Sequence, residues 1–279
     1  MTYNELKADT ITKFESFTDN AKNEIDAIMM HCSGMKKNEL LMRRGDKIPE
    51  SIQEKLTDAI KRRIDREPLQ YILGEWEFFG LRMFCGKGCL IPRPETELLA
   101  DIAIKNLPRG GKFLDLCTGS GCISIAILNN RPDVTAVAVD ISEDALVYAR
   151  KNAEYHGIDS NRLKLVNADI YTYKPDFFPD MIISNPPYIK TDDLQTLSEE
   201  VQHEPSIALD GGYDGLDFYK LIAKSFCNKY LSDNGTCAVE VGYDISAEVA
   251  AIFRSQKFEA KLIRDTFEVD RVCFARKAR

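Results

Sequence analysis

The apolar residues of the first part of the chain recur at helical spacing, whereas those of the later part gather into short continuous runs. Between Ile11 and Ile28 the apolar positions repeat every three or four residues, as on one face of an α-helix. A second helical piece, KKNELLMRR, ends at Gly45, and a third is predicted to open with a capping box formed by Ser51 and Glu54. Such stripes usually form the inside of a helical bundle, although a groove for a partner would show the same spacing. The pattern predicts a small helical domain over residues 1–67.

The residue composition of the sequence changes at Pro68. From there it is rich in aromatic and β-branched residues and is interrupted by Gly74, Gly80, Gly86 and Gly88. This pattern predicts a β-hairpin linker over residues 68–92. The stretch PETELLADIAIKNL then returns to helical spacing, and a third segment, residues 93–279, follows the linker.

Apolar runs alternate with amphipathic stretches through this third segment. Strands are predicted at 112–116, 134–140, 162–167, 181–184, 236–241, 260–264 and 271–275. Helices are predicted around 122–130, 143–156, 217–231 and 246–256. Continuous apolar strands that alternate with helices form parallel sheets covered on both faces, so the pattern predicts a mostly parallel, Rossmann-like α/β sheet. The last two strands have no helix between them, which allows an antiparallel final pair.

Composition and charge narrow the choice of function. With 44% hydrophobic residues and a net charge of −7, the chain looks like an ordinary soluble protein, and the acidic balance argues against a protein whose main task is to grip a nucleic-acid backbone. Its start, MTYNELKADTITKFESF, lacks the apolar region of a secretion signal and the Arg- and Ser-rich character of an organelle presequence, so a cytoplasmic location is expected. The eight cysteines are expected to be reduced, and none has partners at metal-ligand spacing. No metal is predicted.

The carboxyl ends of the first three predicted strands carry residues suited to a nucleoside. After the first strand, Gly119 and Gly121 permit a tight turn that brings backbone N–H groups and a helix start close to a ligand, although such a corner can also need glycines for steric reasons alone. The second strand ends at Asp140, where a carboxylate can accept both ribose hydroxyls, and Ser142 is the predicted N-cap of the next helix. Asp169 follows the third strand and either contacts an adenine amine or caps a local turn.

The same turn argues against a nicotinamide dinucleotide. The dinucleotide fingerprint requires a third glycine at the position where this chain has Ser124. A cofactor without a pyrophosphate does not need that close approach, and S-adenosylmethionine, a nucleoside with a short charged tail, fits better. Asp115, at the end of the first strand, could then face the ammonium or sulfonium charge of this cofactor.

The fourth predicted strand leads directly into the tetrad Asn185-Pro186-Pro187-Tyr188. The two prolines fix the backbone, so the side-chain oxygen of Asn185 and the carbonyl oxygen of Pro186 form a rigid pair of acceptors. Such a pair suits a planar NH₂ group with two donors, and Tyr188 adds an aromatic face for stacking. We interpret the tetrad as a clamp for an amide or exocyclic amine that receives a methyl group. The alternative is that the prolines merely end a strand.

A long polar excursion, residues 190–215, follows the tetrad. Much of its length has neither a helical nor a strand pattern, and segments of this kind in compact domains are often lids or binding loops. We expect it to close over the methyl-transfer site, with a passive surface loop as the alternative. His203 within it is assigned no chemistry.

From EPLQYILGEWEFFGL onward, the sequence resembles the HemK/PrmC family of protein-(glutamine-N5) methyltransferases. The phrases that carry the resemblance are LIPRPETELL, DLCTGSGCISIAI, VDISEDAL, SNPPYI and EPSIALDGGYDGLDFY. The resemblance implies a class I S-adenosylmethionine-dependent methyltransferase fold with seven strands and a small N-terminal domain that binds release factors. It also implies methyl transfer to the glutamine of the Gly-Gly-Gln motif in class I peptide chain release factors.

The resemblance further implies a set of site residues, carried over by position. The implied cofactor contacts are Cys117, Thr118, Gly119, Ser120, Gly121, Asp140, Asp169, Ile170 and Asn185. The implied glutamine contacts are Asn185, Pro186, Pro187 and Tyr188, of which Asn185, Pro186 and Tyr188 are the implied catalytic residues. Ile170 stands at a position that is often aromatic in the family.

Three other functions fit parts of the pattern. A methyltransferase acting on adenine in DNA or guanine in RNA would place the same NH₂ group in the same clamp, but the chain is acidic and lacks a basic target-recognition region. A nicotinamide oxidoreductase would have no use for Asn185 and Pro186. A binding protein that has lost catalysis is at odds with the intact tetrad, and only turnover can separate the two.

Overall fold

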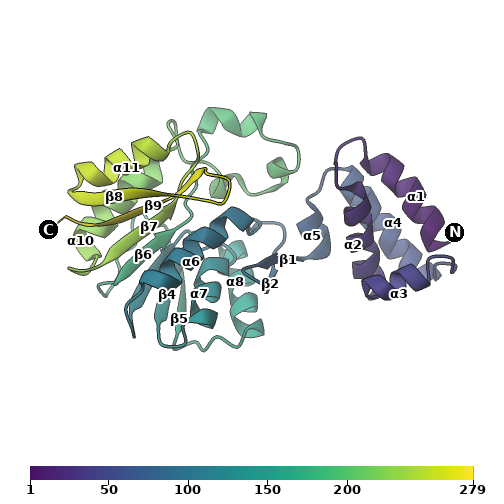
Figure 1. Ribbon diagram of the computed structural model, residues 1–279, viewed down its shortest axis with the longest axis horizontal. Coiled ribbons are helices and arrows are strands. Elements are labelled where there is room, and N and C mark those ends of the chain that lie inside the picture. Colours follow the sequence, from purple (N-terminus) through teal and green to yellow (C-terminus); the bar gives the residue numbers. More distant parts are fainter. Residues whose placement is uncertain (279) are drawn as a thin grey trace. The chain divides into compact units, whose positions relative to one another are not determined.

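The computed structural model describes residues 1–278, and its chain forms two compact units (Figure 1). One unit consists of Met1–Glu75 together with a short distant segment, Glu199–His203. The other consists of Trp76–Ser198 and the chain from Glu204 onward. The division into three segments at residues 67 and 92 stays a prediction.

The first unit is helical, as its apolar spacing predicts. Its helices are α1 (Tyr3–Phe14), α2 (Ala21–Ser33), α3 (Lys37–Met42), α4 (Glu50–Ile64) and α5 (Leu69–Leu73). The apolar stripe is divided between α1 and α2, and Phe14, Ile25 and Ile28 are fully buried in one core with Leu56 of α4. The stripes therefore serve packing within this unit.

The predicted capping box at Ser51 is wrong. Helix α4 begins at Glu50, directly after Pro49, and no side chain caps its amino terminus. Ser51 lies inside the first turn, because a proline preceding the helix already sets an extended entry to it. A capping box does start α1, where the Glu5 N–H donates to Thr2 Oγ1 and the Thr2 N–H donates to Glu5 Oε2.

The distant segment joins the helical unit through a buried arginine. Arg63 is 2% exposed and donates to Glu24 Oε2 at 2.7 Å and to Glu200 Oε1 at 2.9 Å. Nearby, Arg66 donates to Glu199 Oε2 at 2.9 Å, and both guanidinium groups lie over the ring of Phe17. The helical unit is thus completed by residues from the long excursion, which also contains the 3₁₀ turns η2 (Thr191–Thr196), η3 (Val201–His203) and η4 (Ser206–Ala208).

The second unit is built on a seven-stranded sheet, as predicted. Its strands are β3 (Lys112–Leu116), β4 (Thr135–Asp140), β5 (Leu163–Asn167), β6 (Met181–Ser184), β7 (Thr236–Glu240), β8 (Phe258–Arg264) and β9 (Asp270–Lys277). Their order is β5-β4-β3-β6-β7-β9-β8. The first five are parallel, whereas β9 runs antiparallel to both β7 and β8. The allowed antiparallel final pair is therefore present.

Helices cover both faces of this sheet (Figure 1). One face carries α6 (Glu97–Asn106), α7 (Cys122–Asn130) and α8 (Glu143–Tyr155), and the other carries α9 (Asp217–Leu221), the π-helical η5 (Ile222–Cys227), α10 (Asn228–Tyr230) and α11 (Ser246–Ser255). Alternate residues of β6 enter the two cores: Ile183 packs with the first set and Ile182 with the second. The helix predicted at 217–231 is present, but its middle part, Ile222–Cys227, is π-helical.

The predicted hairpin is present and packs within the larger unit. Its strands are β1 (Glu75–Phe78) and β2 (Leu81–Phe84), joined by Phe79 and Gly80, which both have positive φ as the favoured two-residue turn requires. Buried Asn152 of α8 holds it, since the Phe84 N–H donates to Asn152 Oδ1 at 2.6 Å and Asn152 Nδ2 donates to the Phe84 carbonyl at 3.0 Å. The short 3₁₀ turn η1 (Pro94–Thr96) then leads into α6.

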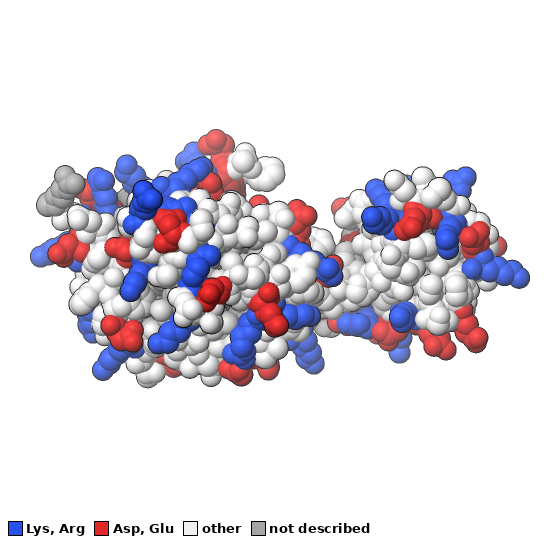
Figure 2. Space-filling view, turned by 90° about the horizontal axis from the view of Figure 1, so that it is seen from below, with Lys and Arg blue, Asp and Glu red and all other residues white. Residues whose placement is uncertain are grey.

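Neither the helices of residues 1–278 nor the face drawn in Figure 2 indicates binding to a membrane or a polyanion. Among residues 1–278, no helix has both the length and the apolar character needed to span a bilayer. Figure 2 shows a face on which Lys and Arg are interspersed with Asp and Glu, without a broad basic area. This face is unlike the continuous basic surfaces that bind nucleic-acid backbones.

Candidate active site

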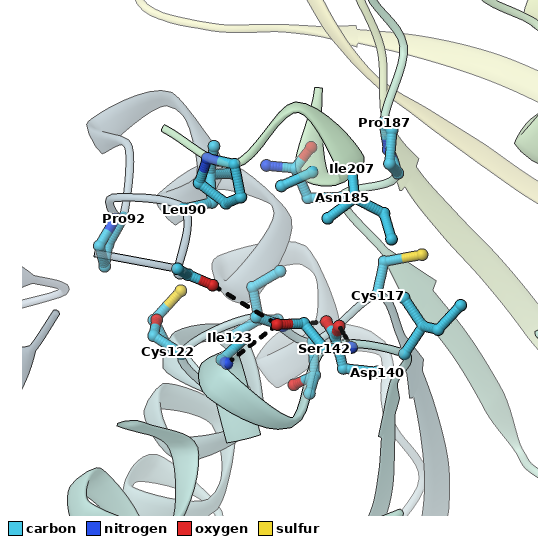
Figure 3. A pocket seen from close by; sticks show the side chains of 18 of the residues that line it. Leu90, Pro92, Cys117, Cys122, Ile123, Asp140, Ser142, Asn185, Pro187 and Ile207 are labelled. Carbon is cyan, nitrogen blue, oxygen red and sulfur yellow. Dashed lines mark hydrogen bonds between the residues drawn. The ribbon is translucent and has the colours of Figure 1, made fainter. Parts of the chain in front are cut away.

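A cavity of about 270 Å³ lies at the carboxyl edge of the parallel strands (Figure 3). The loops that follow β3, β4, β5 and β6 each contribute residues to it, as expected for an open α/β sheet. Figure 3 shows Asp140 and Ser142 on one side of the cavity, with Asn185 and Pro187 on the opposite side. Further walls come from residues 88–96 and from residues 205–208 of the excursion.

The turn after β3 is shaped for a close ligand. Cys117 has φ of 60°, which is uncommon for a residue with a side chain, and Gly119 and Gly121 also have positive φ. A Cβ added at Gly121 would lie 3.2 Å from Ala149 Cβ, so glycine here allows α7 to start against α8. A Cβ added at Gly119 would meet nothing within 4 Å, so this glycine borders open space in the cavity.

Asp140 is fixed at the cavity wall by backbone donors. The Gly119 N–H donates to its Oδ2 at 2.7 Å, and the Ser142 N–H donates to its Oδ1 at 2.9 Å. Burial raises the pKa of Asp140, and these backbone hydrogen bonds offset part of that increase. Each carboxylate oxygen has a further lone pair, so the group can accept two adjacent hydroxyls. Ser142 caps α8 as predicted, because its Oγ accepts from the Ala145 N–H.

The side chain of Asn185 has a defined orientation. Its Nδ2 donates to Thr96 Oγ1 at 3.1 Å, which leaves Oδ1 to accept a hydrogen bond from a ligand in the cavity. The preceding residue, Ser184, is fully buried and donates from Oγ to the Leu116 carbonyl at 2.6 Å. The end of β6 is therefore held both through Ser184 and through the Asn185 side chain itself.

The glycine-rich phrase of the excursion packs on the backbone of the tetrad. The Gly211 N–H donates to the Ile189 carbonyl at 2.8 Å, and a Cβ added at Gly211 would lie 2.6 Å from Tyr188 Cα. A Cβ added at Gly215, where φ is +74°, would lie 2.5 Å from the Tyr188 carbonyl oxygen. Only glycine allows these two segments to approach so closely.

A buried carboxylate joins two further walls of the cavity. Glu204 is 5% exposed, accepts from the Ile91 N–H at 3.0 Å and forms an ion pair with Arg93. The next residues of the excursion, Pro205, Ile207 and Ala208, line the cavity themselves. Glu204 thereby fixes this part of the excursion to the segment that precedes α6.

Comparison with known proteins places the chain in a family. The model of the PrmC N-terminal domain matches residues 6–74, and the model of the methyltransferase small domain matches residues 94–209. A release factor glutamine methyltransferase from Thermodesulfovibrio yellowstonii is 38% identical over 230 residues, which cover 80% of this chain and 81% of that protein. One from Geobacter sulfurreducens is 40% identical over 215 residues, which cover 76% and 74%. The chain belongs to the release factor glutamine methyltransferase family.

The fold is shared more widely than the family. A methyltransferase structure from Pyrococcus furiosus aligns with a TM-score of 0.53 at 16% sequence identity, covering 81% of this chain and 98% of that one. This likeness concerns the fold alone. The release factor glutamine methyltransferase family was the one that the sequence phrases resembled, and the matches confirm that resemblance.

The structure gathers most of the predicted site residues of this family member at one cavity. Those that line it are Cys117, Thr118, Gly119, Ser120, Asp140, Asp169, Ile170, Asn185 and Pro187. Gly121, Pro186 and Tyr188 do not line it: Gly121 packs against α8, Pro186 is buried, and Tyr188 packs against the core that contains Val239. Among residues 1–278, no cluster of three or more His, Cys, Asp or Glu side chains could hold a metal.

Asp115 does not have the predicted position. It is fully buried beneath the turn and accepts hydrogen bonds from Thr118 Oγ1 at 2.7 Å and Ser124 Oγ at 2.6 Å. Burial raises its pKa to about 6, although both hydroxyls lower it. The expectation that it faces a cofactor charge is not supported, because this carboxylate lies beneath the turn and away from the cavity.

Asp169 forms the local turn that was one of its two predicted roles, and its contact with an adenine amine stays a prediction. It accepts from the Tyr171 N–H at 2.8 Å, which closes a local turn, and it also lines the cavity. Ile170 lines the cavity while packing into the core. Tyr171, which the sequence reasoning missed, supplies an aromatic wall beside Phe218, with ring centroids 5.9 Å apart. The sequence did contain a signal for this residue, because Tyr171 directly follows Ile170, the position that is often aromatic in the family.

Other missed residues come from phrases that were quoted for their resemblance alone. The segment before α6 contributes Leu90, Ile91, Pro92, Arg93 and Thr96. The phrase LIPRPET contains all of them, but nothing in its local pattern indicates that it bends over the sheet edge. The contact between Thr96 and Asn185 joins residues 89 positions apart, which no local pattern shows.

Proposed function

We propose that this protein transfers a methyl group from S-adenosylmethionine to the side-chain amide nitrogen of the glutamine in the Gly-Gly-Gln motif of class I peptide chain release factors, and thereby modulates translation termination. Membership of the release factor glutamine methyltransferase family supports the reaction and the substrate class. The observation that carries the proposal is the engagement of Asn185 Nδ2 by Thr96, which leaves an acceptor oxygen for an amide N–H.

The cavity fits the cofactor. S-adenosylmethionine supplies a methyl group attached to a positively charged sulfur that leaves readily. Asp140 would accept the ribose hydroxyls, since its oxygens are fixed by the Gly119 and Ser142 N–H groups. The turn from Cys117 to Ser120 would lie along the cofactor, because Gly119 leaves open space there. Asp169 and Ile170 would border the adenine.

The residues at the end of β6 would prepare the glutamine for reaction. An amide nitrogen is a poor nucleophile, because its lone pair is delocalised into the carbonyl. Asn185 Oδ1 would accept one of its two N–H bonds. The Pro186 carbonyl, between Asn185 and Pro187 that both line the cavity, would accept the other, although the Pro186 side chain itself is buried. Together they would fix the direction of the lone pair, so positioning accounts for much of the rate. Once methylated, the nitrogen is strongly acidic and loses a proton to water, so the mechanism requires no strong general base. Burial raises the pKa of Tyr188 to about 12, so its phenol stays neutral and is no candidate for a general base.

The two other predicted elements complete this proposal. The helical unit, which matches the PrmC N-terminal domain model, would bind the release factor. The excursion would close over the reacting groups, since Pro205, Ile207 and Ala208 already line the cavity. Its glycine-rich phrase supports the tetrad directly, through the contacts of Gly211.

The proposal is tested by locating the methyl group. The purified protein is mixed with isotope-labelled S-adenosylmethionine and either a release factor or duplex DNA, and the products are digested and analysed by mass spectrometry. We expect one methyl group on the glutamine of the Gly-Gly-Gln motif and none on DNA. Asn185→Ala should lose transfer yet still bind S-adenosylhomocysteine in calorimetry. A methyl group on DNA alone would refute the proposed substrate.

A further inference from the structure

A second cavity, of about 300 Å³, lies within the larger unit and takes no part in the proposed methyl transfer. One wall is the turn after β5, residues 170–174, and the other is formed by residues 225, 226, 229 and 230 of η5 and α10. Several of these side chains are exposed to solvent, so a small molecule can enter. This cavity is named the second groove.

Each wall of the second groove carries one lysine. Lys174 and Lys229 are exposed, and neither forms an ion pair with a described residue. Lys220 of α9, by contrast, pairs with Asp214 at 2.7 Å. A lysine ammonium group binds phosphate as a compact point charge. In a chain with a net charge of −7, two unpaired lysines that line one groove favour an anionic ligand.

Aromatic side chains line the second groove beside the lysines. Three of them are the phenols of Tyr171, Tyr173 and Tyr230, and Tyr230 packs against buried Phe226 with ring centroids 6.3 Å apart. Burial raises the pKa of Tyr171 and Tyr173, so their phenols stay neutral and can donate hydrogen bonds. Such rings stack on flat nucleobases. Rings, neutral donors and two cations together suit a nucleobase that carries a phosphate.

The wall formed by η5 departs from ordinary helical geometry. Residues Ile222–Cys227 form a π-helical stretch, a rare conformation that is frequent at functional sites. Four of its six residues are buried, whereas Ser225 lines the second groove next to the buried Phe226. The π-helical stretch is thus a second indication of a ligand, independent of the charges and rings.

The second groove shares a wall with the cofactor cavity. Ile170 and Tyr171 line both of them. The turn that holds these two residues is fastened to Asp169, since the Tyr171 N–H donates to Asp169 Oδ1 at 2.8 Å and the Tyr173 N–H donates to the Asp169 carbonyl at 2.9 Å. Asp169 itself lines the cofactor cavity. A ligand on one side therefore holds in place the wall that the other side needs.

We propose that the second groove binds a nucleoside monophosphate, and that this ligand tightens cofactor binding through the shared wall of Ile170 and Tyr171. Binding in the groove stands apart from the proposed function, whereas the coupling rests on it, because it requires the cofactor in the first cavity. The phosphate lies between Lys174 and Lys229, and the base stacks on the tyrosine rings. By ordering the exposed Tyr171, the first ligand lowers the entropy cost for the second.

The experiment is calorimetric titration of GMP into protein loaded with S-adenosylhomocysteine. GMP is chosen because the first cavity is proposed to take an adenosine, and the loaded protein has that cavity filled. We expect a Kd of about 100 µM or tighter, with guanosine and inorganic phosphate each at least about tenfold weaker. Saturating GMP should lower the Kd of S-adenosylhomocysteine about fivefold, and S-adenosylhomocysteine should lower the Kd of GMP by the same factor.

Three charge reversals place the GMP site. Lys174→Glu and Lys229→Glu should each weaken GMP binding by at least about tenfold. Without GMP, both variants should bind S-adenosylhomocysteine to within about twofold of the wild type. Lys224→Glu is the matched control, since Lys224 is exposed on η5 but does not line the second groove, and it should retain GMP binding.

The outcomes separate the site, the coupling and the proposed function. Absence of saturable GMP binding, equal binding of phosphate and GMP, or equal loss in Lys224→Glu would each refute the second groove as the site. Displacement of S-adenosylhomocysteine by GMP would refute it too, because GMP would then occupy the first cavity. GMP binding without any change in S-adenosylhomocysteine affinity would refute the coupling. A protein that binds GMP but not S-adenosylhomocysteine would refute the proposed function and, with it, the coupling.

Discussion

Two carboxylates, Asp115 of β3 and Asp140 of β4, flank the turn after β3 and differ in position because they meet different donors. Asp140 accepts backbone N–H groups and stays at the cavity wall, whereas Asp115 accepts two side-chain hydroxyls and is fully buried. From sequence, both simply follow or end an apolar strand. Asp115 accepts hydrogen bonds from the side chains of Thr118 and Ser124, so it supports the loop that borders the cavity.

The buried Asp115 makes the stability of the protein depend on pH. Its folded pKa, about 6, lies above the unfolded value near 3.8, so stability falls as pH rises through this window and is constant above it. Asp115→Asn keeps an acceptor but cannot ionise. Between pH 5 and pH 8 we expect the wild type to lose roughly 1–2 kcal/mol of unfolding free energy relative to the variant. Urea unfolding at the two pH values measures this, and an unchanged difference would contradict it.

At the scale of elements, the glycine-rich phrase supports the tetrad by contact between backbones. Residues 210–215 join the tetrad through a bridge between Ile189 and Asp210 and through the close approach of Gly211 to Tyr188. Two prolines stiffen the chain of the tetrad, but the excursion fixes where that chain lies. The glycine-rich phrase, which is one of those that carry the resemblance to the family, thus supports the backbone of the tetrad.

Replacing Gly211 tests this support. Gly211→Ala places a methyl group 2.6 Å from Tyr188 Cα and 2.9 Å from the Pro187 carbonyl oxygen, so one backbone must move. We expect a loss of about 1–3 kcal/mol of stability and a fall in kcat of more than about tenfold. Gly45→Ala is the matched control, because a Cβ there meets nothing within 4 Å and φ is unstrained. Equal activity of the two variants would show that the phrase does not support the tetrad.

Much of the element scale could be predicted from sequence. Strands and helices of the sheet follow from apolar runs and helical spacing, and the antiparallel end follows from the missing helix between β8 and β9. The rest depends on contacts between distant residues. The link of Asn185 to Thr96, the packing of Gly211 on Tyr188 and the bond of Glu204 to Ile91 each join segments that no local period relates. The predicted start of helix α4 was wrong by two residues, because Pro49 and not Ser51 precedes the helix.

At the scale of the whole molecule, the helical unit is not a continuous piece of chain. Arg63 reaches Glu24 within the helices and Glu200 in the excursion, and both the arginine and Glu24 are buried. Removing one member of a buried ionic group leaves an uncompensated charge, which is costly. The helical unit therefore depends on a segment that lies beyond the tetrad in sequence.

The arginine can be tested by comparison with an exposed ion pair. Arg63→Ala should cost about 3 kcal/mol of unfolding free energy, because Glu24 would stay buried without its partner. Lys13→Ala, which breaks an exposed pair with Asp9 on α1, should cost less than about 1 kcal/mol. Chemical denaturation followed by circular dichroism measures both. Similar losses in the two variants would show that the buried group does not stabilise the unit.

The divided helical unit also limits how its sequence can be exchanged between relatives. A single recombination event near residue 75 would bring in a foreign partner for Glu200 and Glu199 while keeping the resident segment Glu199–His203. Such a chimera would take the residues at positions 63 and 66 from one relative and those at positions 199 and 200 from the other. The two sets would not have evolved to pair with each other. Exchange of the intact helical unit between relatives would then require three crossovers, near residues 75, 198 and 203, so that the amino-terminal helices and residues 199–203 are inherited together.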